Sequence, residues 1–246
     1  MSFMSESCFK RVLLKFSGEA LVGEKHSCID PSVLDQLCEE ICSARELGTE
    51  IGIVVGGGNI FRGLSASQQG IDRVKADYMG MLATVINALA IQDALERKGL
   101  KVRVMSAIEM IEVAEPMIVR KANSYLKNGE IIIFCAGTGR PFFSTDTGAA
   151  LRAAEINADA ILKATKVDGV YDKDPVKYTD AKFFDKLDYQ TAIEKRLKVM
   201  DLTSITLCQD NEIPIIVYNM KRPGNLKRIL MGEKIGTIIS RRGNDR

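Results

Sequence analysis

The chain has 246 residues, of which 46% are hydrophobic and 27% charged, and its formal net charge is +2. This length and apolar content can bury a substantial core, which favours one large domain or one domain with two lobes. Acidic and basic residues are interleaved along the sequence without a basic stripe, which argues against a nucleic-acid-binding surface.

Apolar runs that predict strands alternate with helical patterns along the whole sequence. The predicted strands cover residues 12–16, 51–55, 102–105, 130–135, 160–164, 215–218 and 237–239. The predicted helices cover residues 30–48, 72–97, 117–126, 147–157 and 202–209, and a further helix follows Pro223. Repeated strand–helix–strand units, with strands apolar on both sides, predict an α/β fold with a mainly parallel sheet covered by helices. Such sheets bind ligands at the carboxyl ends of their strands.

The residue inventory narrows the expected chemistry. His26 is the only histidine, which excludes a multi-histidine metal site and catalysis by any other histidine. The cysteines form no CxxC pair and the start of the chain has no secretory signal, which indicates a reduced, cytoplasmic protein. No apolar run approaches the ~20 residues that span a bilayer, so we expect no membrane segment. The chemistry is therefore expected from Lys, Arg, Asp, hydroxyl and backbone N–H groups, with room for a hard metal ion.

Two strand ends carry residues suited to binding an anion. Lys15 ends the first buried strand, where an ammonium group is costly unless it meets an anion, although its stem could instead extend to solvent. Gly56, Gly57 and Gly58 follow the second strand, and their backbone N–H groups could cradle phosphate oxygens, with Arg62 within reach. An ordinary flexible turn is the alternative interpretation of the glycines. Neither GxxxxGK[ST] nor GxGxxG is present.

A second glycine-broken loop, residues 136–146, follows the strand at 130–135. It supplies hydroxyl groups, two aromatic residues and a carboxylate just before a helix N-terminus, which attracts anions. Two alternatives stay open: Thr145 or Asp146 could simply cap the helix, and Phe142 and Phe143 could belong to the core. Asp77 lies among small and apolar residues, where a solvated carboxylate is the simplest interpretation. The segment 165–182 is rich in Asp, Lys, Gly and Pro and is interpreted as a functional loop.

Several of these segments together carry a family resemblance. They are residues 15–19, 56–63, 77–81, 138–146, 163–171 and 198–201. In combination they resemble the bacterial uridylate (UMP) kinases, a family within the amino-acid kinase superfamily. The resemblance runs from about Lys10 to the last strand. It implies a three-layer α/β/α sandwich in a single domain over residues 1–246, with an acceptor-binding lobe at about 10–150 and an ATP-binding lobe at about 151–240.

The resemblance also implies a reaction and its site: transfer of the γ-phosphoryl group of Mg-ATP to UMP. The catalytic residues would be Lys15, Arg62 and Asp146. ATP would be bound by Lys15, Phe16, Ser17, Gly18, Gly58, Arg62, Thr165, Tyr171 and Asp174. UMP would be bound by Gly57, Asp77, Thr138, Gly139, Arg140, Pro141, Phe142, Phe143, Ser144 and Thr145, with Asp77 on the ribose hydroxyls. Asp146 would order the phosphate-binding groups or the Mg²⁺, and the Mg²⁺ ligands stay unassigned.

By the same resemblance we expect a homohexamer that UTP inhibits and GTP activates. The segment 23–28, which the resemblance links to GTP activation, is not glycine-rich here, and Arg140 and Ser144 stand where Asn and Thr are more common in the family. Two alternative functions remain: another kinase of the superfamily that acts on a carboxylate or carbamate, and a non-catalytic nucleotide-binding module.

Overall fold

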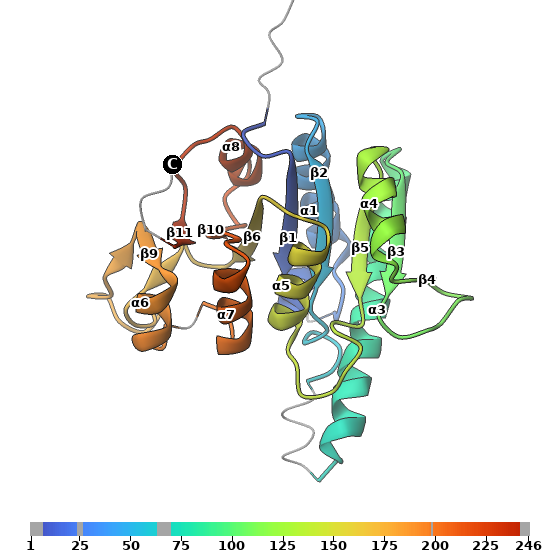
Figure 1. Ribbon diagram of the computed structural model, residues 1–246, viewed down its shortest axis with the longest axis horizontal. Coiled ribbons are helices and arrows are strands. Elements are labelled where there is room, and N and C mark those ends of the chain that lie inside the picture. The colour runs from blue at the N-terminus through green and yellow to red at the C-terminus, as the bar shows by residue number, and fades with distance from the viewer. Residues whose placement is uncertain (1–6, 24–26, 63–69, 198, 242–246) are drawn as a thin grey trace, which may run out of the picture.

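A nine-stranded sheet forms the middle layer of the computed structural model, which describes residues 7–23, 27–62, 70–197 and 199–241 (Figure 1). His26, Gly63 and Lys198 therefore lie outside the described residues, as does the tail at 242–246. The strand order is β4-β3-β5-β2-β1-β6-β10-β11-β9. The strands are β1 (Arg11–Phe16), β2 (Glu50–Val55), β3 (Val102–Ser106), β4 (Glu115–Pro116), β5 (Ile131–Cys135), β6 (Ala160–Thr165), β9 (Lys186–Asp188), β10 (Ile215–Asn219) and β11 (Thr237–Ser240).

The sheet is mainly parallel, as predicted. Only the β10–β11 pair is antiparallel among its neighbouring strands. The central strand β1 pairs in parallel with β2 on one side and β6 on the other, and in this register Lys15 lies opposite both Val54 and Lys163. The carboxyl ends of these three strands consequently meet at one edge of the sheet, where ligands bind in folds of this class.

Helices cover both faces of the sheet and make the three-layer sandwich (Figure 1). On one face, α1 (Pro31–Arg45), α3 (Arg73–Arg97) and α8 (Asn225–Leu230) enclose one apolar core. On the other face, α4 (Val119–Lys127), α5 (Thr145–Glu155), α6 (Tyr189–Glu194) and α7 (Leu202–Asp210) enclose a second core. The two cores alternate along β1: Leu14 and Phe16 belong to the first and Leu13 to the second. The predicted fold class is confirmed.

Helix starts follow from local capping. The Asp30 side chain accepts a hydrogen bond from the Ser32 N–H at the start of α1, with Pro31 in the first turn, and Asp72 caps α3 in the same way through the Lys75 N–H. The alternative in which Thr145 or Asp146 caps the helix after the 136–146 loop is wrong, because the N-cap of α5 is Ser144. The Ser144 hydroxyl accepts hydrogen bonds from the N–H groups of Asp146 and Thr147, at 3.0 and 3.2 Å, which leaves the Asp146 side chain available for another partner.

Short elements escaped prediction because a hydrophobic period needs a longer window to show. They include the 3-10 helix η1 (Gly18–Leu21), the two-residue strand β4, β9 and α6. The segment 165–182 was predicted as a loop, but it contains the strand β7 (Val170–Tyr171), which pairs antiparallel with β8 (Phe183–Phe184). The Tyr171 and Phe183 rings meet edge-on, 5.2 Å between centroids, and close this small hairpin.

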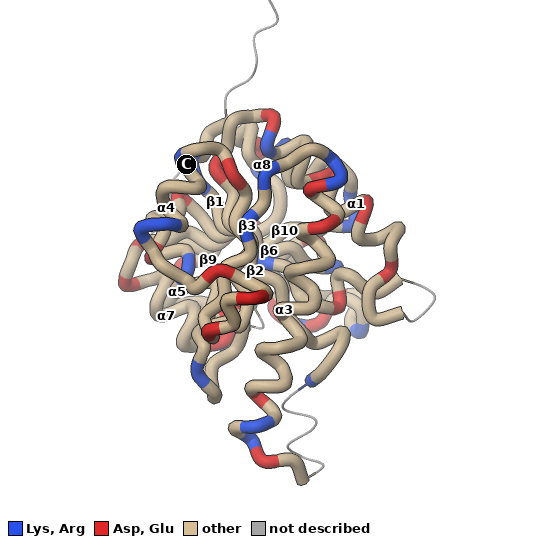
Figure 2. The backbone as a smooth tube through the Cα atoms, turned by 90° about the vertical axis from the view of Figure 1, so that its right-hand side faces the viewer, with Lys and Arg blue, Asp and Glu red and all other residues tan. Residues whose placement is uncertain are grey.

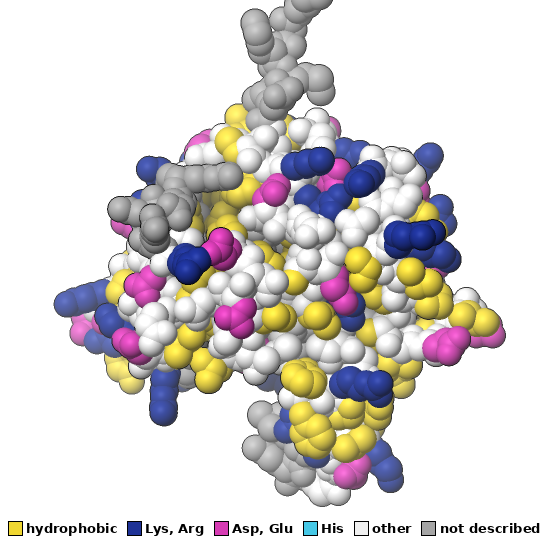
Figure 3. All heavy atoms as spheres, in the orientation of Figure 1, with side chains coloured by type: hydrophobic (Ala, Val, Ile, Leu, Met, Phe, Trp, Pro, Cys, Tyr) yellow, Lys and Arg dark blue, Asp and Glu magenta, His cyan; other side chains and the backbone are white. Residues whose placement is uncertain are grey.

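Helix α3 projects beyond the rest of the sandwich (Figure 1). It is one described helix that is long and apolar enough, by length and composition, to cross a bilayer, with a mean hydropathy of 1.3 over its best window. Core helices pass the same test, and 44% of this window is buried inside the protein. The exposed remainder forms an apolar face that Figure 3 shows gathered on the projecting end. Its residues are Val74, Tyr78, Met79, Leu82, Ile86 and Leu89.

Candidate active site

Two buried lysines and one carboxylate form the centre of the candidate site. Lys15 on β1 pairs through its Nζ with Asp146 Oδ1, and Lys163 on β6 donates from its Nζ to Asp146 Oδ2 at 2.8 Å. Only 7% of the Lys15 side chain, 17% of Asp146 and 14% of Lys163 is exposed. The alternatives of a solvent-directed Lys15 and a capping Asp146 are therefore wrong. The cluster carries a net charge of +1, so it suits an anionic ligand such as a phosphate.

In this cluster the attraction between opposite charges offsets the cost of burying them. Burial acts to raise the pKa of Asp146, but the ammonium groups of Lys15 and Lys163 outweigh it and hold that pKa below its ordinary value. Burial also lowers the pKa of Lys163, which Asp146 counteracts and the charge of Lys15 reinforces. Asp146 therefore stays an anion at neutral pH and balances one of the two cations.

Glycine loops border the cluster and touch each other. The Gly56 N–H donates to the Phe16 carbonyl at 2.9 Å, and a Cβ atom on Gly18 would lie 2.7 Å from the Gly56 carbonyl oxygen. A Cβ on Gly57 would lie 2.7 Å from the Gly80 carbonyl of α3. Glycine is thus required here by close backbone packing. Gly58 differs, because among the described residues its Cβ would meet Arg62 Cγ alone, at 4.0 Å, so this part of the structure leaves it space for a ligand.

Buried amides anchor the glycine loop to α3. Asn87, which is fully buried, donates from its Nδ2 to the Gly56 carbonyl at 2.7 Å and to Asn59 Oδ1 at 2.7 Å. Asn59 in turn donates to the Cys28 carbonyl at 2.6 Å. The loop is therefore a fixed element of the fold, and the flexible-turn interpretation does not apply to it.

Arg62 lies apart from the buried cluster. Its guanidinium is exposed and pairs with Glu19 of η1, and its Nε donates to the Gly58 carbonyl at 3.2 Å. Phe16 and Ser17, which are also expected to bind ATP, have different surroundings. Ser17 precedes η1 without a side-chain capping bond, whereas the Phe16 side chain packs in the core under α1.

The remaining residues predicted to bind ATP lie at the end of β6 and in the segment that follows it. The Thr165 hydroxyl donates to the Val167 carbonyl at 2.8 Å, and the Asp174 carboxylate accepts from the Val176 N–H at 3.0 Å. Tyr171 forms part of the β7–β8 hairpin. Thr165 ends β6 and its hydroxyl also donates to the Tyr218 carbonyl at 3.1 Å, while Tyr171 and Asp174 follow in the next segment. In the described part of the chain none of these hydrogen bonds reaches the Lys15–Asp146–Lys163 cluster.

Asp77 is held in place by Arg73 and by the backbone of Phe142. Arg73 Nε lies 2.9 Å from both Asp77 carboxylate oxygens, and the Phe142 N–H donates to Asp77 Oδ2 at 2.8 Å. The Arg73 guanidinium also lies 5.6 Å from the centroid of the Phe142 ring. Only 13% of the Asp77 side chain is exposed, so the solvated-carboxylate interpretation is wrong. Helix α3 and the loop at 136–144 are joined at this point.

The loop at 136–144 has an unusual backbone. Ala136, Gly137, Gly139 and Phe142 all have positive φ, and the value at Phe142 is 70°, which a bulky residue rarely adopts. Phe142 and Phe143 are 68% and 51% exposed, so the core interpretation is wrong. The loop also holds Thr138, Arg140 and Pro141, and Thr145 begins α5. All of the predicted UMP-binding stretch from Thr138 to Thr145 thus lies between β5 and α5.

The glycine loop at 56–58 and the loop at 136–144 approach each other at Thr145. A Cβ on Gly56 would lie 3.5 Å from Thr145 Oγ1. Gly57 and Gly58 therefore come directly after the residue that approaches the start of α5, and Asp146 is the next residue of that helix after Thr145. The residues predicted to bind UMP at α3 and the 136–144 loop therefore approach those predicted to bind ATP at β1 and η1.

Sequence reasoning gave no role to Lys163 or Asp201, although both lie in segments that carry the family resemblance. Asp201 accepts hydrogen bonds from the Ser144 hydroxyl and from the Thr147 hydroxyl, the latter at 2.9 Å, and caps α7 through the Ser204 N–H. One signal was present for Lys163, which is a charged residue in an apolar strand run. Asp201 carried no comparable signal, because its partners at Ser144 and Thr147 are distant in sequence.

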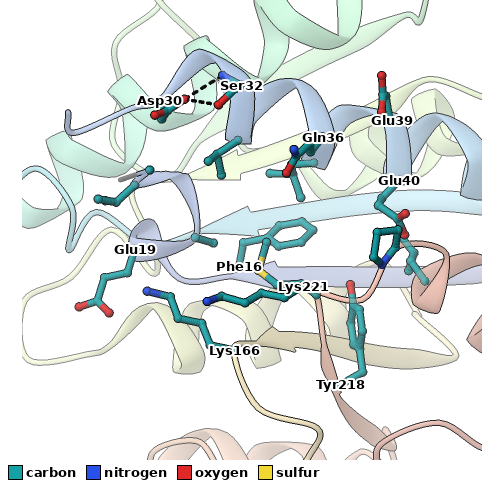
Figure 4. Close-up of a pocket in the computed structure, with 18 residues that line it drawn as sticks. Phe16, Glu19, Asp30, Ser32, Gln36, Glu39, Glu40, Lys166, Tyr218 and Lys221 are labelled. Atoms are coloured by element: carbon teal, nitrogen blue, oxygen red, sulfur yellow. Dashed lines mark hydrogen bonds between the residues drawn. The ribbon is translucent and has the colours of Figure 1, made fainter. Parts of the chain in front are cut away.

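A cavity of about 1000 Å³ opens on the α1 side of the same sheet edge (Figure 4). Its lining includes Phe16, Glu19, Glu40, Lys166, Tyr218 and Lys221. Phe16 and Lys15 point to opposite faces of β1, so the cavity borders the buried cluster without containing it. Figure 2 shows Lys and Arg interspersed with Asp and Glu over the elements of the face it presents.

Comparison with known proteins gives consistent relatives. The sequence profile of the amino acid kinase family matches residues 10–219. A curated uridylate kinase of Legionella pneumophila (strain Corby) is 57% identical over 231 residues, 94% of each chain. The crystal structure of UMP kinase from Bacillus anthracis superposes with a TM-score of 0.91 at 44% identity, covering 94% of this chain and 96% of that one. UMP kinase from Ureaplasma parvum gives 0.88 at 38% identity, covering 94% and 99%.

Proposed function

We propose a function from the premise that this chain belongs to the amino acid kinase family: it is a UMP kinase, which transfers the γ-phosphoryl group of ATP to UMP and gives UDP and ADP. The observation that carries this conclusion is the 57% identity to a curated uridylate kinase over 94% of both chains. The buried, net-cationic cluster at the strand ends supports it, because phosphoryl transfer brings together two anions that repel each other.

Phosphoryl transfer requires the protein to align the two substrates and to supply positive charge near their phosphates. The transition state of phosphoryl transfer is loose and its charge lies on oxygen atoms, so positioned cations and N–H groups lower its energy. The acceptor is an ionised phosphate and needs no general base. In our proposal the Lys15 ammonium contacts the transferred group, while Asp146 keeps that ammonium oriented at the carboxyl end of β1.

In this proposal one group of residues binds ATP, the donor, and a second group binds UMP, the acceptor. The donor side comprises Lys15, Phe16, Ser17, Gly18, Gly58, Arg62, Thr165, Tyr171 and Asp174. The acceptor side comprises Gly57, Asp77 and the stretch from Thr138 to Thr145. The space beside Gly58 in the described structure and the Ser17 side chain, which makes no capping hydrogen bond at η1, support the donor assignment. The exposed rings of Phe142 and Phe143 beside Asp77 support a nucleoside acceptor.

Magnesium is proposed to enter with ATP. No group of three potential metal-ligating side chains (His, Cys, Asp or Glu) occurs among the residues described between 7 and 241. This fits Mg²⁺, which usually keeps several waters and binds through substrate phosphates with one or two carboxylates. Both oxygens of Asp146 already contact ammonium groups, so we assign Asp146 to ordering Lys15 and Lys163. Bound Mg²⁺ would supply further countercharge to the phosphate oxygens.

The architecture supports further expectations of the same kind. We propose an acceptor-binding lobe at about 10–150 and an ATP-binding lobe at about 151–240 within one domain, in a cytoplasmic enzyme of pyrimidine nucleotide biosynthesis. We also propose a homohexamer, inhibited by UTP, and the exposed apolar face of α3 supports self-association. GTP activation stays a prediction, because residues 24–26 of the segment linked to it lie outside the described residues.

One assay tests the function directly. ADP formation from ATP and Mg²⁺ is measured with UMP and, separately, with CMP, glutamate, acetylglutamate and carbamate as acceptors. We expect ADP with UMP far in excess of the other acceptors. ADP formed with a carboxylate or carbamate instead would assign another reaction of the superfamily, and no ADP with any acceptor would point to a nucleotide-binding module without catalysis.

A further inference from the structure

Lys163 is a buried cation to which the proposed transfer has so far given no task. We infer that Lys163 is a positioning residue that fixes Asp146 and the segment at 199–201 so that the Lys15 ammonium stays free to contact the transferred phosphoryl group. This inference rests on the proposed UMP kinase function.

The strand register is the first support. Lys15 and Lys163 occupy paired positions on the neighbouring parallel strands β1 and β6, so their side chains leave the same face of the sheet side by side. Two ammonium groups at such a distance repel each other unless an anion lies between them. Asp146 is that anion, and it offers one oxygen to each lysine. The carboxylate is therefore shared, and neither lysine holds it alone.

The hydrogen-bond donors are divided unequally between the two lysines. An ammonium group has three N–H donors. Lys163 uses two of them, on Asp146 Oδ2 and on the Val199 carbonyl. In the described part of the chain, Lys15 has Asp146 Oδ1 as its one side-chain partner. Lys163 is thus the anchored member of the pair, and Lys15 keeps donors for phosphate oxygens.

Lys163 also closes a ring of contacts around the start of α5. Val199, whose carbonyl it binds, stands two residues before Asp201. Asp201 binds the hydroxyls of Ser144 and Thr147, which flank Asp146 in the first turn of α5. The first turn is consequently held from two sides by one connected set of polar contacts. Without Lys163, Asp146 is free to turn both oxygens toward Lys15 and occupy the donors that the phosphate needs.

The expected signature is therefore a loss of turnover with little change in UMP binding. In Lys163→Met, which keeps the length of the stem and removes the donors, kcat should fall about 10²-fold, the size of effect that a misplaced reacting group produces. The KM for UMP should change by less than about threefold, because the acceptor residues at Asp77 and 136–144 make no contact with Lys163 in the described structure. Lys163→Arg retains charge and donors and should recover part of the loss, whereas Lys163→Gln should recover less.

The test measures kcat and the KM for UMP in the wild type, Lys163→Met, Lys163→Gln and Lys163→Arg, with Lys186→Met as the control. Lys186 is an exposed strand lysine on β9, and its variant should match the wild type. A kcat of Lys163→Met within threefold of the wild type, or equal losses in all three variants, would overturn the inference. If thermal unfolding shows that Lys163→Met does not fold, the comparison of Arg with Gln decides: at least tenfold higher kcat for Arg supports the inference, and equal values overturn it. A wild type that forms no ADP with UMP refutes the proposed function instead.

Discussion

Asp146 illustrates how one carboxylate can organise a site at the scale of single residues. Asp146 lies in the first turn of α5, where the Ser144 hydroxyl already accepts the hydrogen bonds of the N–H groups at the helix start. The Asp146 carboxylate oxygens are therefore able to contact lysines on two strands. Removing its charge leaves two buried ammonium groups facing each other. Such an uncompensated pair is both unstable and badly oriented for binding phosphate.

We therefore expect Asp146→Asn to lower kcat by ~10² to 10³, the usual effect of losing one preorganised electrostatic element. Steady-state kinetics with UMP and ATP measure this. Arg97→Ala, at an exposed ion pair on α3, is a suitable control for the loss of a surface charge. Turnover of Asp146→Asn within a few-fold of the wild type would contradict the assignment.

The same residue predicts a change in the pH dependence of stability. The pKa of Asp146 is lowered on folding from a reference value of 3.8, so the unfolded chain binds its proton more readily. The stabilisation is present above the reference pKa and is lost as the pH falls through the lower folded value. Urea unfolding at pH 3 to 7 should therefore show a shallower fall in the free energy of unfolding below about pH 4 in Asp146→Asn than in the wild type. Parallel curves for the two proteins would argue against the ion cluster.

Asp77 carries a prediction about sugar selectivity. If its carboxylate binds the ribose hydroxyls, a charge-assisted hydrogen bond worth ~1.5–3 kcal/mol is at stake. The preference for UMP over 2′-deoxyUMP, measured as a ratio of kcat/KM values, should shrink roughly tenfold or more in Asp77→Ala. An unchanged ratio would remove Asp77 from the ribose site and leave it a purely structural partner of Arg73.

At the scale of elements, the loop at 136–144 depends on α3 for its conformation. Its left-handed residue Phe142 is held by the Asp77 carboxylate through its N–H and by Arg73 against its ring. Backbone strain of this kind persists only where neighbouring contacts over-determine it. The loop at 136–144 is thus kept in shape by a helix that begins more than sixty residues earlier in the chain.

Arg73→Ala should consequently weaken UMP binding more than turnover. We expect the KM for UMP to rise about tenfold, since one charged hydrogen bond of the usual strength is lost. The KM for ATP should stay near the wild-type value, because Arg73 contacts no residue of the donor side in the described structure. Equal increases in both KM values would indicate a general loss of structure, which thermal unfolding would reveal.

Particular elements show how far the sequence predicts this fold. The long strands and helices, the parallel sheet and the start of α1 at Asp30 were predicted because local hydrophobic period and capping chemistry determine them. The hairpin of β7 and β8 was not, because two-residue strands have no period. In the site, Lys15 was identified from its place at the end of a strand. The partners of Asp146 and Asp201 are distant in sequence, so only the fold brings them together.

At the scale of the whole molecule, the apolar face of α3 calls for a partner. Contiguous apolar surface of this kind on a protein marks an interaction site, and a second copy of the chain is the occupant we propose. Leu82→Glu combined with Ile86→Glu places two charges on that face and should reduce the assembly size seen by sedimentation equilibrium. Met231→Glu, an exposed apolar residue at the end of α8, serves as the control and should leave the assembly unchanged. An assembly that survives the double substitution would place the interface elsewhere.

Ile86 and Asn87 are neighbours on α3, but about 100° apart around its axis, so they face different surroundings. Ile86 is exposed on the apolar face, while the Asn87 amide holds the Gly56 carbonyl at the start of the glycine loop. Because Asn87 joins α3 to the loop, a shift of α3 caused by a change at its outer surface would also shift the loop. Substitutions on the outer face of α3, where copies of the chain would meet, are then expected to change the catalytic rate although they lie far from both nucleotides. Selection on that surface would therefore act through catalytic rate as well as through assembly.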